Sequence, residues 1–183
     1  MRIIITGASG SGTSTLGRSL ASRLASQHFD ADDFYWLPTD EPFCDKRAVA
    51  DRLQLMDAVF VPRRDWVLSG SVLGWDETLR PRLTLAVLLV LDPRLRLARL
   101  ERREVLRRGD AILPGGPLHA SYAYFMDWCR GYDDPAFAGR SLRRHHAWLV
   151  GLPCAVMTLN ADTSVEALVD QVVGRLDHAR AGA

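Results

Sequence analysis

Two apolar runs along the chain predict buried strands, and a third run predicts a further strand. Residues 2–6 are short and β-branched, residues 83–91 are apolar almost throughout, and residues 154–159 form a further short run. A run without polar alternation is typical of a strand covered on both faces, as in a parallel sheet. Residues 83–91 are therefore the candidate for the central strand.

Between these runs, hydrophobic positions recur with a helical period. Leu16, Leu20 and Leu24 are spaced by four residues, which places them on one face of a helix over residues 14–26. Strands are also predicted at residues 28–31 and 66–69, and helices at residues 46–60, 93–108, 119–131 and 139–149 and after a cap near Thr163 or Ser164. Strands that alternate with helices predict an α/β protein built around a parallel sheet.

Composition fits one unit of this kind. With 183 residues, 48% of them hydrophobic, residues 1–183 are expected to form a single domain. The 23 basic and 22 acidic side chains nearly cancel, which argues against nucleic acid or an anionic membrane surface as a partner. No apolar run approaches the roughly 20 residues that span a bilayer, and the N-terminus does not follow the pattern of a signal peptide. We therefore expect a cytoplasmic protein, and the three widely spaced cysteines are expected to be free thiols.

The turn after the first strand carries the strongest chemical signal. Residues 7–14 match the Walker A pattern G-x-x-x-x-G-K-[ST] at Gly7, Gly12 and Ser14, whereas Thr13 stands in place of the lysine. Glycines allow backbone amides to point inward around an anion, and the helix that begins near Thr13 adds its positive end. Ser14 is placed to bind magnesium. The residues predicted to bind a nucleotide are Gly7, Ser9, Gly10, Ser11, Gly12, Thr13, Ser14 and Thr15.

The threonine leaves alternatives open. Its hydroxyl can donate a hydrogen bond but carries no positive charge, so affinity or transfer rate falls unless another cation takes the role of the lysine. The turn can instead be an inactive relic of a phosphate loop, or serve tight packing alone. A dinucleotide-binding loop fits less well, because Gly7, Gly10 and Gly12 do not follow the spacing G-x-G-x-x-G.

A cluster of carboxylates follows the second predicted strand. Asp30, Asp32 and Asp33 lie at the carboxyl end of that strand, where open α/β sheets bind ligands. One carboxylate can accept the proton of an acceptor hydroxyl, with Asp32 and Asp33 as candidates, and another can serve magnesium. Tyr35 and Trp36 can cover a ring or a sugar. The alternative is a solvated turn whose aspartates cap the next helix.

Other positions are expected at the same end of the sheet. Residues 69–71 allow a backbone to approach an acceptor closely, although a plain turn explains them almost as well. Trp75 and Asp76 are expected near this region. Lys46 is the only lysine, and it either replaces the missing Walker A lysine or is a solvated residue at the start of a helix.

The helix predicted over residues 93–108 is strongly basic and leads into a loop rich in glycine and proline. Arg99, Arg103 and Arg107 recur with helical spacing, so they share a face that can clamp phosphates. Arginines on a closing lid stabilise the charge of a transferred phosphoryl group and exclude water. We assign Arg103 and Arg107 to this catalytic role and Arg99 to nucleotide binding. The alternative is a solvated helix in which Glu101 and Glu104 pair with arginines. The other basic candidates are Arg94, Arg96, Arg102 and Arg108, with Arg140, Arg143 and Arg144 further along.

These residues resemble the adenylate kinase-like and shikimate kinase-like P-loop kinases, over almost the whole chain. Asp30 and Asp32 are similar to the D-x-D of shikimate kinases, in which the first carboxylate serves the metal and the second the acceptor. Residues 32–35 look equally like the acceptor-site motif of uridine and nicotinamide riboside kinases. The chain also looks similar to small bacterial proteins described as adenylate kinases or P-loop ATPases, some of which carry threonine in place of the lysine.

The resemblance implies a P-loop NTPase fold, a three-layer sandwich whose five-stranded parallel sheet has the order 2-3-1-4-5. It also implies an acceptor-binding region near residues 32–62 and an arginine lid near residues 102–117. Adenine would lie between the base of the lid and the loop at Asn160. After the third strand, residues 69–73 lack the D-G-[FY]-P-R signature of adenylate kinases, which argues against AMP as the acceptor.

Together these expectations favour an ATP- and magnesium-dependent kinase that acts on a small-molecule, nucleoside or nucleotide acceptor. The alternative is a nucleotide-binding protein with little or no catalysis, which acts as a sensor or through a partner. We expect a monomer or homodimer that binds neither nucleic acid nor membrane.

Overall fold

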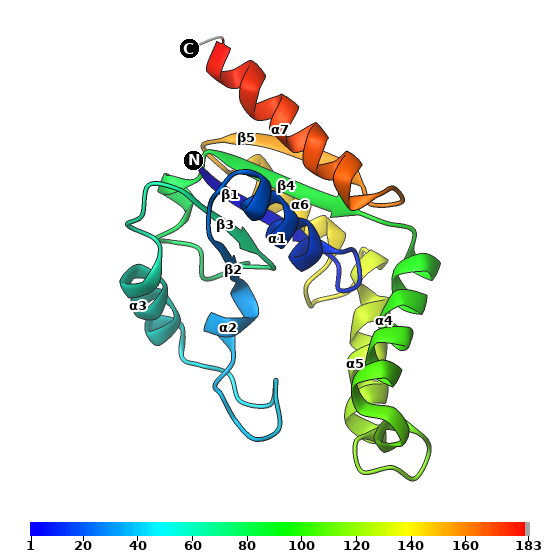
Figure 1. Cartoon of the computed structure of the whole chain (residues 1–183). Helices are drawn as coiled ribbons and strands as arrows, with labels where there is room; N and C mark the ends of the chain where they lie inside the picture. The colour runs from blue at the N-terminus through cyan, green and yellow to red at the C-terminus, as the bar shows by residue number, and fades with distance from the viewer. Residues whose placement is uncertain (182–183) are drawn as a thin grey trace.

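The sheet of this protein is five-stranded and parallel. The computed structural model describes residues 1–181, and its strands are β1 (Arg2–Gly7), β2 (His28–Asp30), β3 (Trp66–Ser69), β4 (Leu85–Val90) and β5 (Ala155–Asn160). They lie in the order β2-β3-β1-β4-β5, which confirms the predicted topology (Figure 1). The central strand is β1, flanked by β3 and β4, so the expectation that residues 83–91 hold that place was wrong. The apolar character of residues 83–91 reflects burial on both faces, a property that β4 shares with β1.

The six predicted helices are all present at the expected places, with differences at their ends. They are α1 (Thr13–Arg23), α2 (Ala31–Tyr35), α3 (Val49–Val59), α4 (Pro93–Arg108), α5 (His119–Arg130), α6 (Leu142–Val150) and α7 (Val165–Ala181), with short 3-10 turns η1 (Arg80–Arg82), η2 (Gly109–Ile112) and η3 (Gly131–Asp133). The short α2 was not predicted. Helix α6 begins later than expected because Ser141 caps it, accepting a hydrogen bond from the N–H of Arg144 at 3.4 Å.

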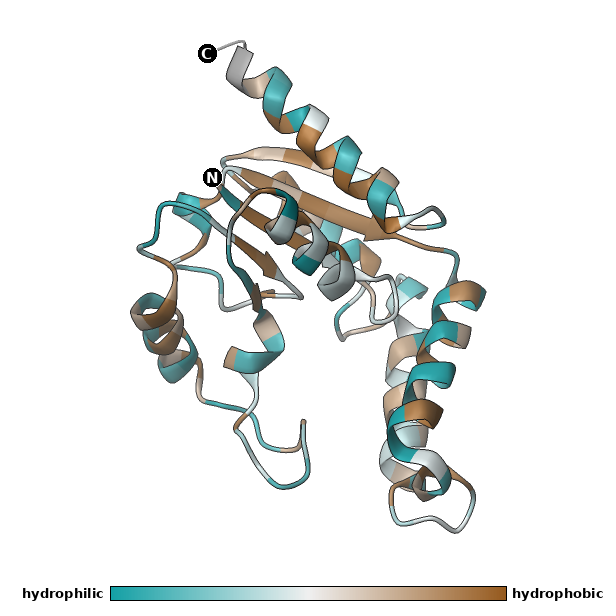
Figure 2. Ribbon diagram, in the orientation of Figure 1, coloured by the Kyte–Doolittle hydropathy of each residue, from teal (hydrophilic) through white to brown (hydrophobic). Residues whose placement is uncertain are grey.

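Helices cover both faces of the sheet. Ile5 of β1 points to the face under α1 and α7, where it packs in one cluster with Leu16. Ile4 points to the opposite face, in a cluster with Met56 of α3 and Trp148 of α6. Because successive side chains of a strand point to opposite faces, an unbroken apolar strand supplies both cores. Figure 2 shows the result: the central strands are hydrophobic along their length, whereas the helices around them also carry hydrophilic positions.

Helices α4 and α5 pair with each other and project beyond the carboxyl end of β4 (Figure 1). Leu100, Met126 and Cys129 form a small buried cluster between them, separate from the two cores on the sheet. The pair therefore has its own packing and stands beside the loop that follows β1. None of the helices in residues 1–181 combines the length and apolar character needed to cross a membrane.

Candidate functional site

The loop over residues 7–14 turns the chain from β1 into α1. Gly10 and Gly12 have φ angles of +85° and +95°, a region that glycine adopts without strain. The backbone N–H and the hydroxyl of buried Ser11 both donate to the carbonyl of Ala8, at 3.1 and 2.8 Å, which holds the turn. Among the described residues, no side chain caps the N-terminus of α1. Its first N–H groups and the positive end of its dipole are therefore available to an anion beside the loop.

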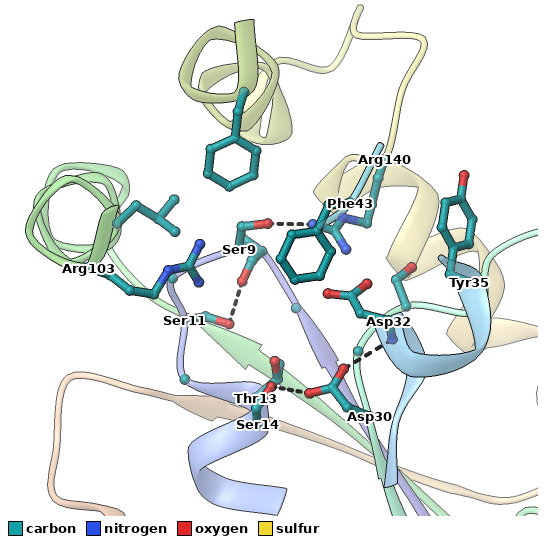
Figure 3. Close-up of a pocket in the computed structure, with 18 of the residues that line it drawn as sticks. Ser9, Ser11, Thr13, Ser14, Asp30, Asp32, Tyr35, Phe43, Arg103 and Arg140 are labelled. Carbon is teal, nitrogen blue, oxygen red and sulfur yellow. Dashed lines mark hydrogen bonds between the residues drawn. The ribbon is translucent and has the colours of Figure 1, made fainter. Parts of the chain in front are cut away.

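This loop lines a cavity of about 1390 Å³. Much of the remaining wall comes from α2 and the loop after it, from the α4–α5 pair, and from the segment that leads into α6 (Figure 3). The segments that follow β3 and β5 also contribute. Thr15 lines the cavity and is exposed. All of residues 7–15 thus line one side of the cavity, with the carboxylates and the arginines on the others.

Ser14 and Asp30 meet at the edge of the loop. The Ser14 hydroxyl donates to Asp30 Oδ2 at 2.6 Å, and the Ser69 hydroxyl donates to the same oxygen at 3.1 Å. The other carboxylate oxygen of Asp30 accepts from the backbone N–H of Asp32 at 3.2 Å, which caps α2. Asp30 therefore caps α2 and also presents an oxygen beside Ser14 (Figure 3).

His28 supports this arrangement from β2. Its Nε2 is hydrogen-bonded to the Ser69 hydroxyl at 2.9 Å. Burial lowers the pKa of His28, an effect that the nearby Asp30 carboxylate partly opposes. The ring therefore favours its neutral form and holds Ser69 against Asp30 without adding a charge.

Asp32 and Asp33 share the first turn of α2 but have different neighbours. Asp32 points into the cavity toward Arg140 (Figure 3). Burial raises the pKa of Asp32, the Asp30 carboxylate raises it further, and the positive charge of Arg140 opposes the rise. Burial and Asp30 also raise the pKa of Asp33, but there the opposing charge is Arg18 on α1. A carboxyl with a raised pKa is a stronger proton acceptor, and Asp32 is the one on the side of the loop facing Arg140.

An aromatic wall follows α2. The ring centroids of Tyr35 and Trp36 are 4.8 Å apart, and those of Tyr35 and Trp75 are 5.9 Å apart. The Arg52 guanidinium stacks on Tyr35 at 3.8 Å from the ring centroid, which fixes that ring. Phe43 extends the wall, with its ring centroid 6.1 Å from that of Trp36.

The basic helix α4 contributes only part of its charge to the cavity. Arg99, Arg103, Arg107 and Arg108 line it, whereas Arg94, Arg96 and Arg102 do not. Arg103 donates twice to Glu104 Oε1, at 2.9 and 2.7 Å, and Arg108 donates to the other oxygen of Glu104 at 3.2 Å. Pairing with Glu104, the alternative interpretation of the sequence, therefore coexists with a place in the cavity wall. Arg96 is buried and pairs with Asp133, so it has a structural role.

Arg140 is far from the phosphate loop in the sequence but contacts it in the structure. Its Nη2 donates to the Ser9 hydroxyl at 2.6 Å, and its guanidinium lies 4.9 Å from the ring centroid of Trp128 on α5. The residue comes from the segment between η3 and α6 (Figure 3). In the sequence it was one of several undistinguished arginines, and only the fold brings it to Ser9.

Two other candidate positions from the sequence are Asn160 and Lys46. Asn160 ends β5, where its Oδ1 accepts from the N–H of Asp162 at 3.0 Å, and it is not among the described residues that line the cavity. Ala161 and Thr163 line the cavity there instead. Lys46 lies on the cavity wall formed by the loop after α2, exposed and bridged through its backbone to Trp36.

Trp75 and Asp76 also separate in the structure. Trp75 is buried and lines the cavity. Asp76 accepts hydrogen bonds from Trp148 Nε1 at 2.7 Å and from Arg80 Nε at 2.9 Å, so its carboxylate holds α6 and η1 on the sheet. Its role is structural.

Sequence reasoning missed His145, the buried centre of a polar network. Its Nε2 is hydrogen-bonded to the hydroxyls of Thr6 and Ser71, each at 3.0 Å, and its Nδ1 to the hydroxyl of Tyr132 at 2.8 Å. Thr6 lies directly before the phosphate loop, and Ser71 lies two residues after the end of β3. The ring thus joins three segments around the site, and no spacing in the sequence signals this.

The pKa of His145 leads to a stability prediction. Burial lowers it from 6.5 to about 3, with the positive charges of Arg140, His146 and Arg144 acting in the same direction. Between these values the unfolded chain binds a proton that the folded protein does not, so stability is lost as pH falls below 6.5. We expect a loss of about 2 kcal/mol in the free energy of unfolding between pH 6.5 and pH 5 from this group. Urea unfolding at a series of pH values measures it.

The matching variant is His145→Gln, which keeps a hydrogen-bonding side chain but cannot be protonated. It should be less stable than the original protein at pH 7 and should lose less stability as the pH is lowered. Equal slopes of unfolding free energy against pH for the two proteins would contradict the prediction.

The strand order, the glycine-rich loop at the end of the central strand and the carboxylates on the neighbouring β2 define a class. This chain has the fold of the P-loop kinases of the shikimate kinase-like and adenylate kinase-like group, as predicted. More narrowly, it belongs to the family of AAA domains, which residues 3–110 match. The uncharacterized protein YqaC of Bacillus subtilis (strain 168) is 38% identical over 174 residues, which covers 95% of this chain and 96% of that protein.

Solved structures agree on the fold. A shikimate kinase from Bacteroides thetaiotaomicron has a TM-score of 0.57 and 19% identity, covering 97% of this chain and 98% of the kinase. A sugar kinase from Janibacter sp. HTCC2649 has a TM-score of 0.56 and 17% identity, covering 100% of this chain and 97% of that one. At these identities the likeness establishes the fold, and the chemistry must be argued from the site.

Proposed function

We propose that this protein is an ATP- and magnesium-dependent kinase that phosphorylates a small-molecule acceptor. The observation that carries the proposal is the contact of Ser14 with Asp30, 2.6 Å between oxygens, at the edge of an uncapped helix N-terminus. A hydroxyl and a carboxylate side by side are hard oxygen donors of the kind that bind magnesium together with phosphates and water. The fold of kinases that act on small molecules supports the same conclusion.

In this proposal the loop binds the donor. The backbone N–H groups of residues 7–14 and the N-terminus of α1 hold the phosphates of ATP, and Ser14 and Asp30 hold magnesium. Magnesium bound there would neutralise phosphate charge and polarise the transferred group. Arg99 lies where it can contact the nucleotide from α4.

Asp32 acts on the acceptor. It takes the proton of the acceptor hydroxyl while that oxygen forms a bond to the γ-phosphorus, and the bond from this phosphorus to the bridging oxygen of ADP breaks. Its raised pKa suits it to accept a proton. Arg103 and Arg107, on a lid over residues 102–117, stabilise the charge of the transferred group as the lid closes.

The aromatic wall indicates the kind of acceptor. Tyr35 and Trp36 line the cavity with Asp32 and are partly exposed, so their rings offer apolar surface to a nucleobase or to the apolar face of a sugar, whereas the buried Trp75 packs against Tyr35. Residues 32–62 then form the acceptor-binding region of a single domain.

The first test is titration of the protein with Mg-ATP by calorimetry. We expect binding that the Ser14→Ala variant weakens by roughly 10-fold or more, because a charge-assisted contact at the phosphates and metal is lost. Ser22→Ala is the matched control, since Ser22 is exposed near the other end of α1. Equal affinity of the Ser14→Ala variant and the original protein would contradict the proposed donor site.

A second reading is favoured by Thr13, which leaves the loop without the usual lysine. In that reading the protein binds nucleotide but transfers little phosphate, and acts as a sensor or through a partner. A screen of small-molecule, nucleoside and nucleotide acceptors separates the two readings: transfer above the solution background supports the kinase, and nucleotide binding without any transfer supports the second reading.

A further inference from the structure

A phosphate loop without lysine needs its positive charge from elsewhere. The hydroxyl of Thr13 is neutral, and Thr13 is half-buried at the start of α1. The transferring phosphates of ATP carry several negative charges, and stabilising them is most of what a kinase does. If the site works, a cation that is distant in sequence has to reach the loop in space.

Arg140 is a cation that the fold holds beside the loop. Its Nη2 donates to Ser9 of the loop at 2.6 Å, and its guanidinium packs against Trp128. The chain before it is fixed by Arg144, whose Nη1 donates to the carbonyls of Ala138 at 3.0 Å and Gly139 at 3.3 Å. The side chain is therefore positioned before any ligand arrives, which reduces the entropy lost on binding.

The charge of Arg140 lacks an ion-pair partner within residues 1–181. Its Nε is buried without a hydrogen-bond partner there. The Asp32 carboxylate raises the pKa of Arg140 by its charge but forms no salt bridge with it. A desolvated guanidinium is costly unless it is paired. Burial accordingly lowers the pKa of Arg140, although a guanidinium stays protonated in proteins. An anion bound at the loop would complete this environment.

The other cations that line the cavity are exposed or already have partners. Arg99 and Arg107 are exposed on α4, Arg108 donates to Glu104, and Arg144 donates to the carbonyls of Ala138 and Gly139. Arg103 is already paired twice with Glu104. Lys46 is exposed on the wall formed by the loop after α2, and Arg18 is exposed on α1 next to Asp33. Arg140 combines contact with the loop, partial burial and an uncompensated charge.

We propose that Arg140 supplies the positive charge that Thr13 does not, and contacts the phosphates of the bound nucleotide in the place of a Walker A lysine. The inference rests on the proposed donor site and says which residue completes it. Its N–H groups that are not bonded to Ser9 would donate to phosphate oxygens, in the charge-assisted geometry that arginine offers.

Moving the positive charge from position 140 to position 13 tests the proposed role of Arg140. Four proteins are titrated with Mg-ATP and with magnesium tripolyphosphate: the original, Arg140→Met, Thr13→Lys, and the double variant. We expect Arg140→Met to weaken binding by roughly 10- to 100-fold, the loss for one charged hydrogen-bonding partner. The double variant should recover at least 10-fold of that loss, because the lysine returns the charge from the helix. Arg130→Met is the matched control, since Arg130 ends α5 at the surface and does not line the cavity.

The possible outcomes distinguish a failure of the role of Arg140 from a failure of the proposed donor site. Binding that Ser14→Ala weakens but Arg140→Met leaves unchanged would keep the donor site and overturn the role of Arg140. A loss in Arg140→Met that Thr13→Lys does not recover would also overturn it, since a role in packing against Trp128 is not restored by a distant lysine. Failure of the original protein to bind either probe would overturn both. Thermal unfolding of each variant checks that it is folded.

Discussion

Replacing Asp32 by Asn is expected to lower the rate of phosphoryl transfer by roughly 10²- to 10⁴-fold, the usual contribution of a general base. The amide keeps the size of the side chain but cannot accept the proton of the acceptor. The backbone N–H of Asp32 donates to Asp30, the partner of Ser14, and the substitution retains this hydrogen bond. The affinity for Mg-ATP should therefore change much less than the rate. The rate is measured with the acceptor found by the screen, or with water as acceptor.

Asp33→Asn is the matched comparison, because it removes the same charge one residue further along α2. Asp33 faces Arg18, whereas Asp32 faces Arg140, so the loss in rate should be clearly smaller for Asp33. A larger effect of Asp33→Asn would assign the base to Asp33. That outcome would favour the match of residues 32–35 to the acceptor-site motif of riboside kinases. The match of Asp30 and Asp32 to the D-x-D of shikimate kinases would then be wrong.

Gly10→Ala is expected to damage both the fold and nucleotide binding. A Cβ at this position would lie 2.5 Å from the carbonyl oxygen of Arg96 and 2.8 Å from Leu100 Cγ. The backbone φ of +85° is also unfavourable for alanine. Strain and overpacking together should lower the free energy of unfolding by about 2–5 kcal/mol. Because relief requires the loop or α4 to move, the affinity for Mg-ATP should fall as well.

The variant Gly12→Ala separates the effect of backbone strain from the effect of overpacking. Gly12 has a φ of +95°, but nothing among the described residues lies within 4 Å of an added Cβ. The substitution should therefore lower the free energy of unfolding by only about 1–2 kcal/mol, the effect of backbone strain alone. Chemical unfolding of both variants measures the difference. Equal losses of unfolding free energy in the two variants would show that the close contact of α4 with Gly10 adds nothing to the cost of the substitution.

The sequence predicted the fold well because the signals involved are local. The strands β1 and β4 are built on apolar runs, and α1 and α4 carry a clear period or a clear cap. The order of the strands came from resemblance, since nothing within a strand says which neighbour it will pair with. The unpredicted α2 has only five residues, too few for a period, and it depends on the Asp30 side chain as its cap.

By itself the sequence determined the phosphate loop and the carboxylates of α2. Residues 7–14 are contiguous, so their spacing alone fixes which amides converge, and Asp30 and Asp32 are tied by a local cap. Only the tertiary structure decided how these parts are completed. Arg140 reaches Ser9 across 131 positions, and His145 reaches Thr6 across 139. Such pairs form when helices pack on the sheet, and a one-dimensional pattern holds no record of a contact between elements that meet only after folding.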